Sequence, residues 1–436
     1  MKNISRSANL KKQILYSYVF KLLAISANFL VIPLMVKYLG KEVYGIWSTL
    51  LSIVSWFIMF DIGIGNGLRN KVSEAIAKEN LSEAKSYIAT AYVAIGTIVF
   101  ILFLSFLPFS YCISWQRVFN TQLITESELR LAISVMLFFI LFNFWLSLVD
   151  QVLYGIQKTS LSILNQLLKN LLVLLFTTLL YYTYSGSLLS MIIIYGLSLV
   201  AANLIISGYF YSKNQHLIPL LTNYSRKKLK AITSLGINFF VIQVAGIVLF
   251  TTDKILITQL FGNNQVTDYD IVFKIFSIPI MAHGMLTAPL WAAYTDAYHR
   301  KDYLWLKSTL KKQLKIFLLF VIATIALCFA SPTIIRLWIG TEITISNSLI
   351  LSIALFVLIS IWSAIFSTFV NALNLLRLQR TTALIAMCIN IPLSIYLAKQ
   401  FNIGIAAVVL GSCVALSLFA ILGCKQVFSF LKKLPT

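Results

Sequence analysis

The basic residues of this 436-residue chain are sorted into alternate gaps between twelve apolar segments. Each segment has about 20 residues or a few more, and about 20 helical residues cross a hydrocarbon core of roughly 30 Å. Because a helix satisfies its own backbone groups, the segments predict an all-α, polytopic membrane protein. The expected spans are 13–36, 44–65, 87–109, 129–151, 161–184, 188–211, 234–259, 269–291, 313–332, 347–370, 381–399 and 404–424.

The distribution of Lys and Arg predicts the topology. Alternate gaps and the termini carry 25 of the 35 basic residues, the opposite gaps carry six, and four lie inside spans. Because short cytoplasmic loops carry the excess of Lys and Arg, both termini are expected in the cytoplasm. The net charge of +21 is thus explained by topology, and no nucleic acid is expected as a partner.

The chain repeats itself at an offset of 222 residues, which places Gly262 on Gly40 and Asp302 on Asn80. Each copy reads as a short amphipathic helix, a polar break and the entry to the next span. Since each half has an even number of spans, both halves enter the membrane in the same direction, as parallel repeats do. The pattern favours two facing bundles around a central cavity, which is the usual frame for alternating access.

We therefore expect an N-terminal six-helix lobe at 1–211, a cytoplasmic linker at 212–233 and a C-terminal six-helix lobe at 234–436. The gaps between spans are too short to hold an extramembrane domain. No P-loop, metal cluster or catalytic triad is apparent, so we expect a transporter without a cofactor rather than an enzyme.

Two lysines inside the N-terminal half are the main functional clue, because a lysine at mid-bilayer costs about 2.5–3.5 kcal/mol. Lys21 and Lys169 are each about 12 Å from the cytoplasmic edge by helix rise. Asp61 and Asp150 lie near span ends, so no carboxylate is expected at this depth. The hypothesis is that the substrate supplies the anion; the alternative is that both lysines bind backbone carbonyls or water.

Polar neighbours on the same helix faces complete the predicted substrate site. Lys274 in the eighth span is a further candidate, although its ammonium could instead reach the outer surface. Asp253 and Lys254 are expected to neutralise each other or other partners. The full set of predicted substrate-binding residues is Lys21, Asn28, Asn165, Gln166, Lys169, Asn170 and Lys274.

A glycine-rich motif follows the second span. Gly65 belongs to a G-x-G-x-G run, but no strand precedes it, so a dinucleotide site is excluded. We expect the glycines to open the helix at the membrane surface, with Asp61 and Arg69 paired near the cavity mouth. The predicted cytoplasmic motif comprises Asp61, Gly65, Asn66 and Arg69.

YLGKEVYGIW at 38–47, followed by DIGIGNGLRN at 61–70, resembles the opening of the O-antigen (Wzx-type) polysaccharide-transport flippases of the multidrug/oligosaccharidyl-lipid/polysaccharide (MOP) superfamily. This resemblance implies flipping of an undecaprenyl-pyrophosphate-linked oligosaccharide from the inner to the outer leaflet of a bacterial plasma membrane. It also implies a cationic cavity, membrane lipids around the lobes and other polysaccharide-assembly membrane proteins as candidate partners.

Three alternatives remain open. An ion-coupled multidrug exporter of the same superfamily would favour an acidic cavity, which the buried lysines argue against. A membrane polymerase or ligase would normally show a large outer loop with convergent polar groups. A scaffold for polysaccharide assembly would not need buried lysines.

Overall fold

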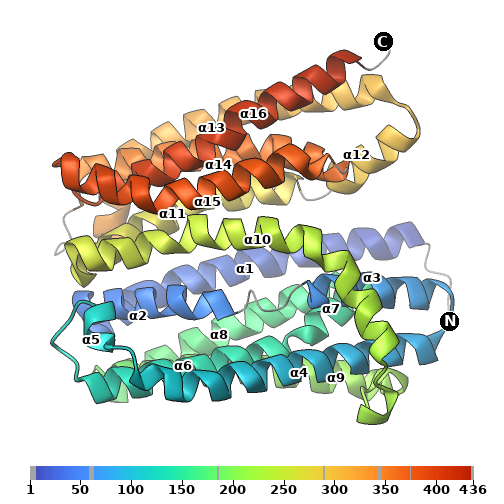
Figure 1. Ribbon diagram of the computed structural model, residues 1–436, viewed down its shortest axis with the longest axis horizontal. Helices are drawn as coiled ribbons and strands as arrows, with labels where there is room; N and C mark the ends of the chain where they lie inside the picture. The colour runs from blue at the N-terminus through green and yellow to red at the C-terminus, as the bar shows by residue number, and fades with distance from the viewer. Residues whose placement is uncertain are drawn as a thin grey trace. The chain divides into compact units, whose positions relative to one another are not determined.

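The computed structural model describes residues 6–57, 63–183, 186–287, 290–340, 345–373 and 375–433. Almost all of these residues are helical, and none of them forms a strand (Figure 1). Ten of the helical segments in this part of the chain are long and apolar enough to cross a membrane. The protein is therefore an all-α, polytopic membrane protein, as its apolar segments predict.

The chain divides into two compact units, Met1–Phe240 and Val241–Thr436. Helix α10, Arg226–Phe261, continues through the boundary without a break. Its first turns hold residues 226–233, half of which are basic and all of which were expected in the linker. The non-helical part of this connection is shorter and lies between Asn214 and Ser225, where two 3-10 turns interrupt it.

The N-terminal unit is a helical bundle in which α1 packs on α8, α8 and α6 pack on α9, and α4 packs on α3 and α6. Its buried core contains apolar side chains such as Leu68, Ile88, Val149 and Phe210. The helices are α1 (Arg6–Leu39), α2 (Lys41–Ser55), α3 (Ile64–Ala77), α4 (Leu81–Tyr111), α5 (Trp115–Val118), α6 (Glu126–Leu146), α7 (Leu148–Gly155), α8 (Thr159–Thr183) and α9 (Leu188–Lys213).

The C-terminal unit has α14 at its centre, in contact with α11, α13 and α16. One core cluster of this unit gathers aromatic side chains, including Tyr294, Phe366 and Phe369. After α10, the helices are α11 (Asn263–Thr287), α12 (Leu290–His299), α13 (Tyr303–Trp338), α14 (Asn347–Ala372), α15 (Leu376–Gln400) and α16 (Ala406–Lys433).

Two predicted spans are not among the ten. The span at 44–65 corresponds to α2, which ends at Ser55, and part of the predicted range lies outside the described residues. The span at 234–259 lies within α10.

Backbone geometry at equivalent positions confirms the repeat. Gly40 and Gly262 have φ angles of 76° and 87°, and Glu79 and Lys301 have φ angles of 56° and 61°. Positive φ is uncommon for residues other than glycine, so its recurrence at the 222-residue offset is informative. Both irregular turns of the first half therefore recur in the second half.

The residues that follow Glu79 and Lys301 each cap the next helix. The Asn80 side chain accepts a hydrogen bond from the backbone N–H of Glu83, and the Asp302 side chain accepts one from Trp305. An oxygen at the N-cap satisfies a donor that the first helical turn leaves open. The polar breaks predicted from the sequence are therefore helix starts.

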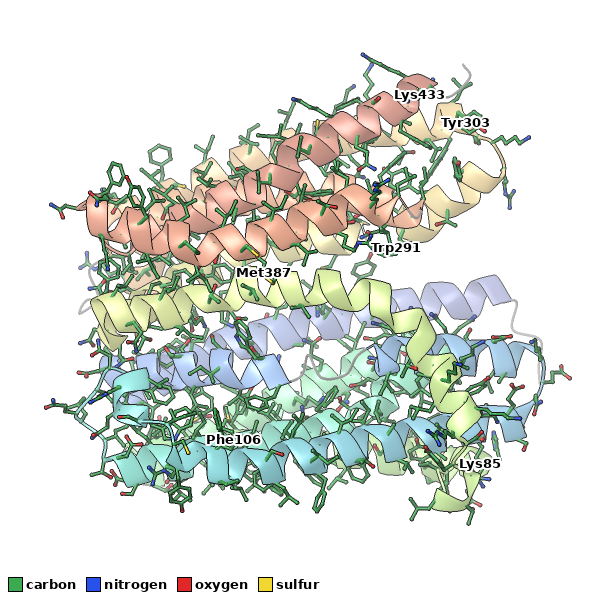
Figure 2. All side chains as sticks on the ribbon, in the orientation of Figure 1. Lys85, Phe106, Trp291, Tyr303, Met387 and Lys433 are labelled. Atoms are coloured by element: carbon green, nitrogen blue, oxygen red, sulfur yellow. The ribbon has the colours of Figure 1, made fainter. Side chains whose placement is uncertain are left out.

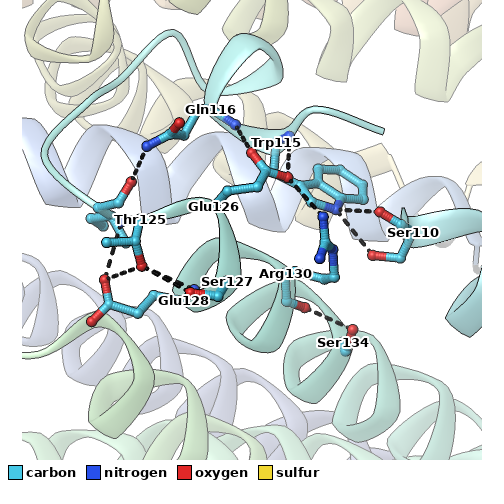
Figure 3. A network of polar contacts seen from close by, with 10 residues as sticks. Ser110, Trp115, Gln116, Thr125, Glu126, Ser127, Glu128, Arg130 and Ser134 are labelled. Carbon is cyan, nitrogen blue, oxygen red and sulfur yellow. Dashed lines mark hydrogen bonds and ion pairs between the residues drawn. The ribbon is translucent and has the colours of Figure 1, made fainter. Parts of the chain in front are cut away.

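The segment between α4 and α6, which lies in the gap between the expected spans 87–109 and 129–151, is a compact connection and not a domain (Figure 3). The carboxylate of Glu126 accepts hydrogen bonds of 2.9 Å from the backbone N–H groups of Trp115 and Gln116. The indole of Trp115 donates to the backbone carbonyl of Ser110 at 3.1 Å. These contacts fix the segment between α4 and α6 against the start of α6.

Candidate functional site

Lys21 lies on α1 and faces α8. Its Nζ donates a hydrogen bond of 2.9 Å to Oε1 of Gln166, and it forms no ion pair with any residue in the described ranges. One turn further, Asn170 Nδ2 donates to the backbone carbonyl of Ala24 at 2.7 Å. The polar stripe of α1 therefore meets the polar side of α8, and no carboxylate among the described residues pairs with Lys21 there.

Lys169 does have a carboxylate partner, which corrects the expectation from the sequence. Its Nζ lies 3.8 Å from Oδ2 of Asp150, and both side chains are mostly buried. Side chains on a helix point toward its N-terminus, which for α8 is the end nearer to Asp150. Helix rise alone placed the two residues at different depths because it ignored this direction.

A row of asparagines holds Asp150 in place. Asn165 Nδ2 lies 3.1 Å from both carboxylate oxygens of Asp150 and 2.8 Å from Oδ1 of Asn203. Asn203 in turn donates to Oδ1 of Asn143 at 2.6 Å. Asn165 and Asn203 are fully buried. The network therefore ties α6, α7, α8 and α9 together inside the N-terminal unit.

The predicted N-terminal site residues consequently fall into two groups. Lys21 and Gln166 contact each other, and Asn28 is half-buried two turns further along α1. Asn165 and Asn170 are occupied by contacts between helices, and Lys169 by its ion pair. Of the two predicted lysines, Lys21 is therefore the one that has no carboxylate partner among the described residues.

The cytoplasmic motif is organised by α3. Gly63 is the N-cap of α3 and has a left-handed conformation, Gly65 is buried in the first turn, and Asn66 is exposed. The guanidinium of Arg69 lies 5.1 Å from the ring centroid of Tyr154. Asp61, its predicted partner, lies outside the described residues.

The second glycine of α3 has a packing role. A Cβ atom on Gly67 would lie 2.2 Å from the backbone oxygen of Ile232 on α10. Only a residue without a side chain allows these two backbones to approach so closely. The glycine-rich motif therefore fits α3 against the start of α10.

The C-terminal unit has its own buried polar group. Lys254 pairs with Asp270 at 2.6 Å, whereas its neighbour Asp253 accepts a hydrogen bond of 2.7 Å from the hydroxyl of Ser412. Lys254 is thus paired with Asp270 of α11, which is one of the two arrangements expected from the sequence. Lys274 lies one turn after Asp270 on the same helix and is half-buried.

Sequence reasoning missed several members of these groups. Asn203 and Asn390 are single asparagines in apolar spans, and each is fully buried with a polar partner from another helix. A lone amide in an apolar span is a detectable signal, because an unsatisfied polar group in the bilayer core is costly. The identity of its partner requires the structure.

Comparisons with known proteins identify the family of this chain. The family model described as polysaccharide biosynthesis protein matches residues 10–294. The chain belongs to this family. It is 23% identical over 367 residues to a Yersinia pseudotuberculosis protein named for O-antigen export, with 82% of each chain covered. It is 23% identical over 376 residues to a Salmonella typhimurium protein named for O-antigen transport, with 83% of each covered.

Solved structures show the fold of this chain. An inward-facing multidrug resistance transporter of the MATE family, in the MOP superfamily, matches with a TM-score of 0.80 at 16% identity, covering 97% of this chain and 100% of the other. A MOP transporter from Pyrococcus furiosus, described as having a binding pocket of reversed polarity, matches with a TM-score of 0.68 at 18% identity, covering 97% of each. The chain therefore has the MOP transporter fold, and the family assigned from its opening motifs is confirmed.

Proposed function

We propose that this transporter flips an undecaprenyl-pyrophosphate-linked oligosaccharide from the inner to the outer leaflet of a bacterial plasma membrane by alternating access. The observation that carries the proposal is Lys21, an intramembrane ammonium that is held by a neutral amide and has no carboxylate among the described residues. The relatives named for O-antigen transport support a polysaccharide cargo.

The chemistry of a pyrophosphate suits this ammonium. A lysine inside a span is costly, so it is retained where it has a function or a partner. Attraction between opposite charges is several times stronger near a protein interior than in bulk water. A pyrophosphate that enters beside α1 and α8 would therefore gain its largest electrostatic contact from Lys21, and Gln166 would hold the ammonium in place until then.

The remaining predicted residues receive more limited roles in this proposal. Lys169 and Asp150 form a pair with no net charge, so Lys169 offers the substrate less attraction than Lys21 does. Asn28 and the exposed Gln166 remain candidates for hydrogen bonds to the headgroup or to sugar hydroxyls. Asn165 and Asn170 act by positioning α8, and Lys274 is a candidate contact of the second unit.

The proposal is tested by the arrival of lipid-linked oligosaccharide at the outer leaflet in cells. Cells would carry the wild-type chain, Lys21→Gln or Lys21→Arg at matched membrane levels. Lys37→Gln is the matched control, because Lys37 lies on the same helix and is exposed at its other end. We expect loss of arrival in Lys21→Gln, partial arrival in Lys21→Arg and normal arrival in the control.

The alternatives give different results in the same cells. A multidrug exporter would lower the toxicity of amphipathic cations and leave oligosaccharide arrival unchanged when its gene is deleted. A scaffold would support normal arrival in Lys21→Gln, because its membrane partners would still assemble. Either result would overturn the flippase proposal.

A further inference from the structure

An apolar groove of about 750 Å³ lies on the N-terminal unit, away from the helix pair that carries Lys21. Helix α4 forms one wall, α9 forms part of the other, and Trp145 of α6 lies between them. The connector 214–225 closes one end. The lining residues are Ala89, Tyr92, Val93, Gly96, Thr97, Phe100, Trp145, Leu146, Ser207, Tyr211, Ile218, Pro219, Leu220 and Leu221.

Hydrogen bonds hold the walls of this groove in place. The Trp145 indole donates to the backbone carbonyl of Tyr92 at 2.9 Å. On the connector, the carbonyl of Asn223 accepts a bond of 2.7 Å from the Ser86 hydroxyl, and the N–H of Ser225 donates to Oγ1 of Thr90 at 3.1 Å. The connector is thus fixed to α4 and does not fill the groove.

The groove has the length of one leaflet. From Ala89 to Phe100, α4 rises about 16 Å, which is close to half of a hydrocarbon core. The positive-inside pattern places the connector end at the cytoplasmic surface. Phe100 at the other end is 63% exposed, and Leu221 of the connector is 81% exposed. The groove therefore suits a hydrocarbon chain of the cytoplasmic leaflet.

Basic residues surround the cytoplasmic end of the groove. Lys85 lies one turn before Ala89 on α4, beside the connector (Figure 2), and Arg226 and Lys227 follow the connector directly. None of these three forms an ion pair within the described ranges. The segments 84–100 and 203–233 contain no Asp or Glu, and the nearest acid in the sequence is Glu83, two residues before Lys85. Such a patch of positive charge at the membrane surface attracts anionic lipid headgroups.

We propose that this groove binds an anionic phospholipid of the cytoplasmic leaflet, with one acyl chain between α4 and α9 and the phosphate on Lys85, Arg226 and Lys227. The charge complementarity and the length of the groove argue for this occupant. The flippase substrate is assigned elsewhere, because Lys21 faces α8 from α1, and α1 contributes nothing to the groove. Bound lipid would fix the connector against α4 just before α10 begins.

The test is lipid retention by the purified full-length protein, measured by native mass spectrometry in equal mixtures of phosphatidylglycerol and phosphatidylcholine with identical chains. We expect the wild type to retain phosphatidylglycerol preferentially. The triple variant Lys85→Gln/Arg226→Gln/Lys227→Gln should weaken this retention by roughly fivefold for each charge removed. Thr97→Trp, which fills the groove, should also weaken it.

Controls separate this site from nonspecific binding. Arg377→Gln/Arg380→Gln removes two exposed charges of the other unit and should retain phosphatidylglycerol as the wild type does. Leu175→Trp adds the same bulk to an exposed position of α8 and should also retain it. Unchanged retention in both the triple variant and Thr97→Trp, or equal retention of the two lipids by the wild type, would overturn the proposal.

One further arm identifies the occupant. Undecaprenyl phosphate would be added at the concentration of phosphatidylglycerol. Displacement of phosphatidylglycerol from the wild type, together with loss of undecaprenyl phosphate binding in Thr97→Trp, would assign the groove to the transport substrate and contradict our proposal. Binding of both lipids to one protein molecule would support separate sites. Because this experiment measures lipid retention, its result does not depend on whether the protein flips the oligosaccharide.

Discussion

Lys169 and Asp150 meet across two helices, with Nζ 3.8 Å from Oδ2, although they lie 19 positions apart on either side of the turn that joins α7 to α8. Their side chains are 15% and 18% exposed. Both charges are therefore largely removed from water, and each depends on the other for compensation. Asn165 completes the shell around the carboxylate.

Breaking this pair from one side should destabilise the protein. Removing one partner of a buried pair leaves an uncompensated charge at a cost of up to about 3–5 kcal/mol, and partial exposure reduces this to about 1–3 kcal/mol. We expect Lys169→Met and Asp150→Asn each to lower the melting temperature in detergent. The double variant should lose less than the two single losses together; additive losses would show that the two residues act independently.

Gly67 should not tolerate a side chain. Its Cβ would lie 2.2 Å from the backbone oxygen of Ile232, so Gly67→Ala must push α3 and α10 apart. We expect a loss of about 1–3 kcal/mol of stability, typical of overpacking. Gly208→Ala is the matched control, because nothing lies within 4 Å of its added Cβ. Equal melting temperatures for the two variants would contradict the close approach.

The repeated helix caps predict equal effects in the two units. Asn80→Ala and Asp302→Ala each remove a side-chain acceptor from the N-cap of a long helix. The expected cost is about 1 kcal/mol for each, and Ser at either position should restore most of it. Thermal unfolding measures both; a loss at one cap only would show that the repeated geometry does not have the same energetic role.

A surface ion-pair cluster on α3 predicts a pH response. Hydrogen bonds from Lys71 and Lys78 lower the pKa of Glu74 to about 2. Because the folded-state pKa is depressed, any stability from these pairs is present above pH 4.5 and is lost as the pH falls toward about 2. A ¹³C NMR titration of Glu-labelled protein should show this carboxylate still ionised at pH 4, and Lys78→Met should raise its pKa.

Much of the fold follows from the sequence for simple physical reasons. Span length and polarity are set by the bilayer, so apolar runs locate the helices. The repeat is visible because Gly40, Gly262, Asn80 and Asp302 are required by special backbone geometry or by capping. Such local requirements need no knowledge of distant partners.

The site was harder to predict because its polar contacts join distant segments. Lys21 meets Gln166 across 145 residues, and the Asn165–Asn203 bond spans 38. Counting depth along the helix also gave the wrong prediction that Lys169 has no carboxylate nearby, because the lysine side chain carries its charge well away from Cα toward Asp150. The polarity of the sequence therefore identified the candidate residues. Only the contacts in the structure distinguish Lys21 from Lys169, which has a carboxylate partner.

The most direct test of our account measures transbilayer movement of undecaprenyl-pyrophosphate-linked oligosaccharide in proteoliposomes that contain only the purified protein. The wild type should move the lipid, Lys21→Gln should reduce the rate at least about tenfold, as expected for loss of a charged contact, and Lys37→Gln should keep it. Movement by Lys21→Gln at the wild-type rate, with both proteins equally folded, would contradict an anion-binding role for Lys21.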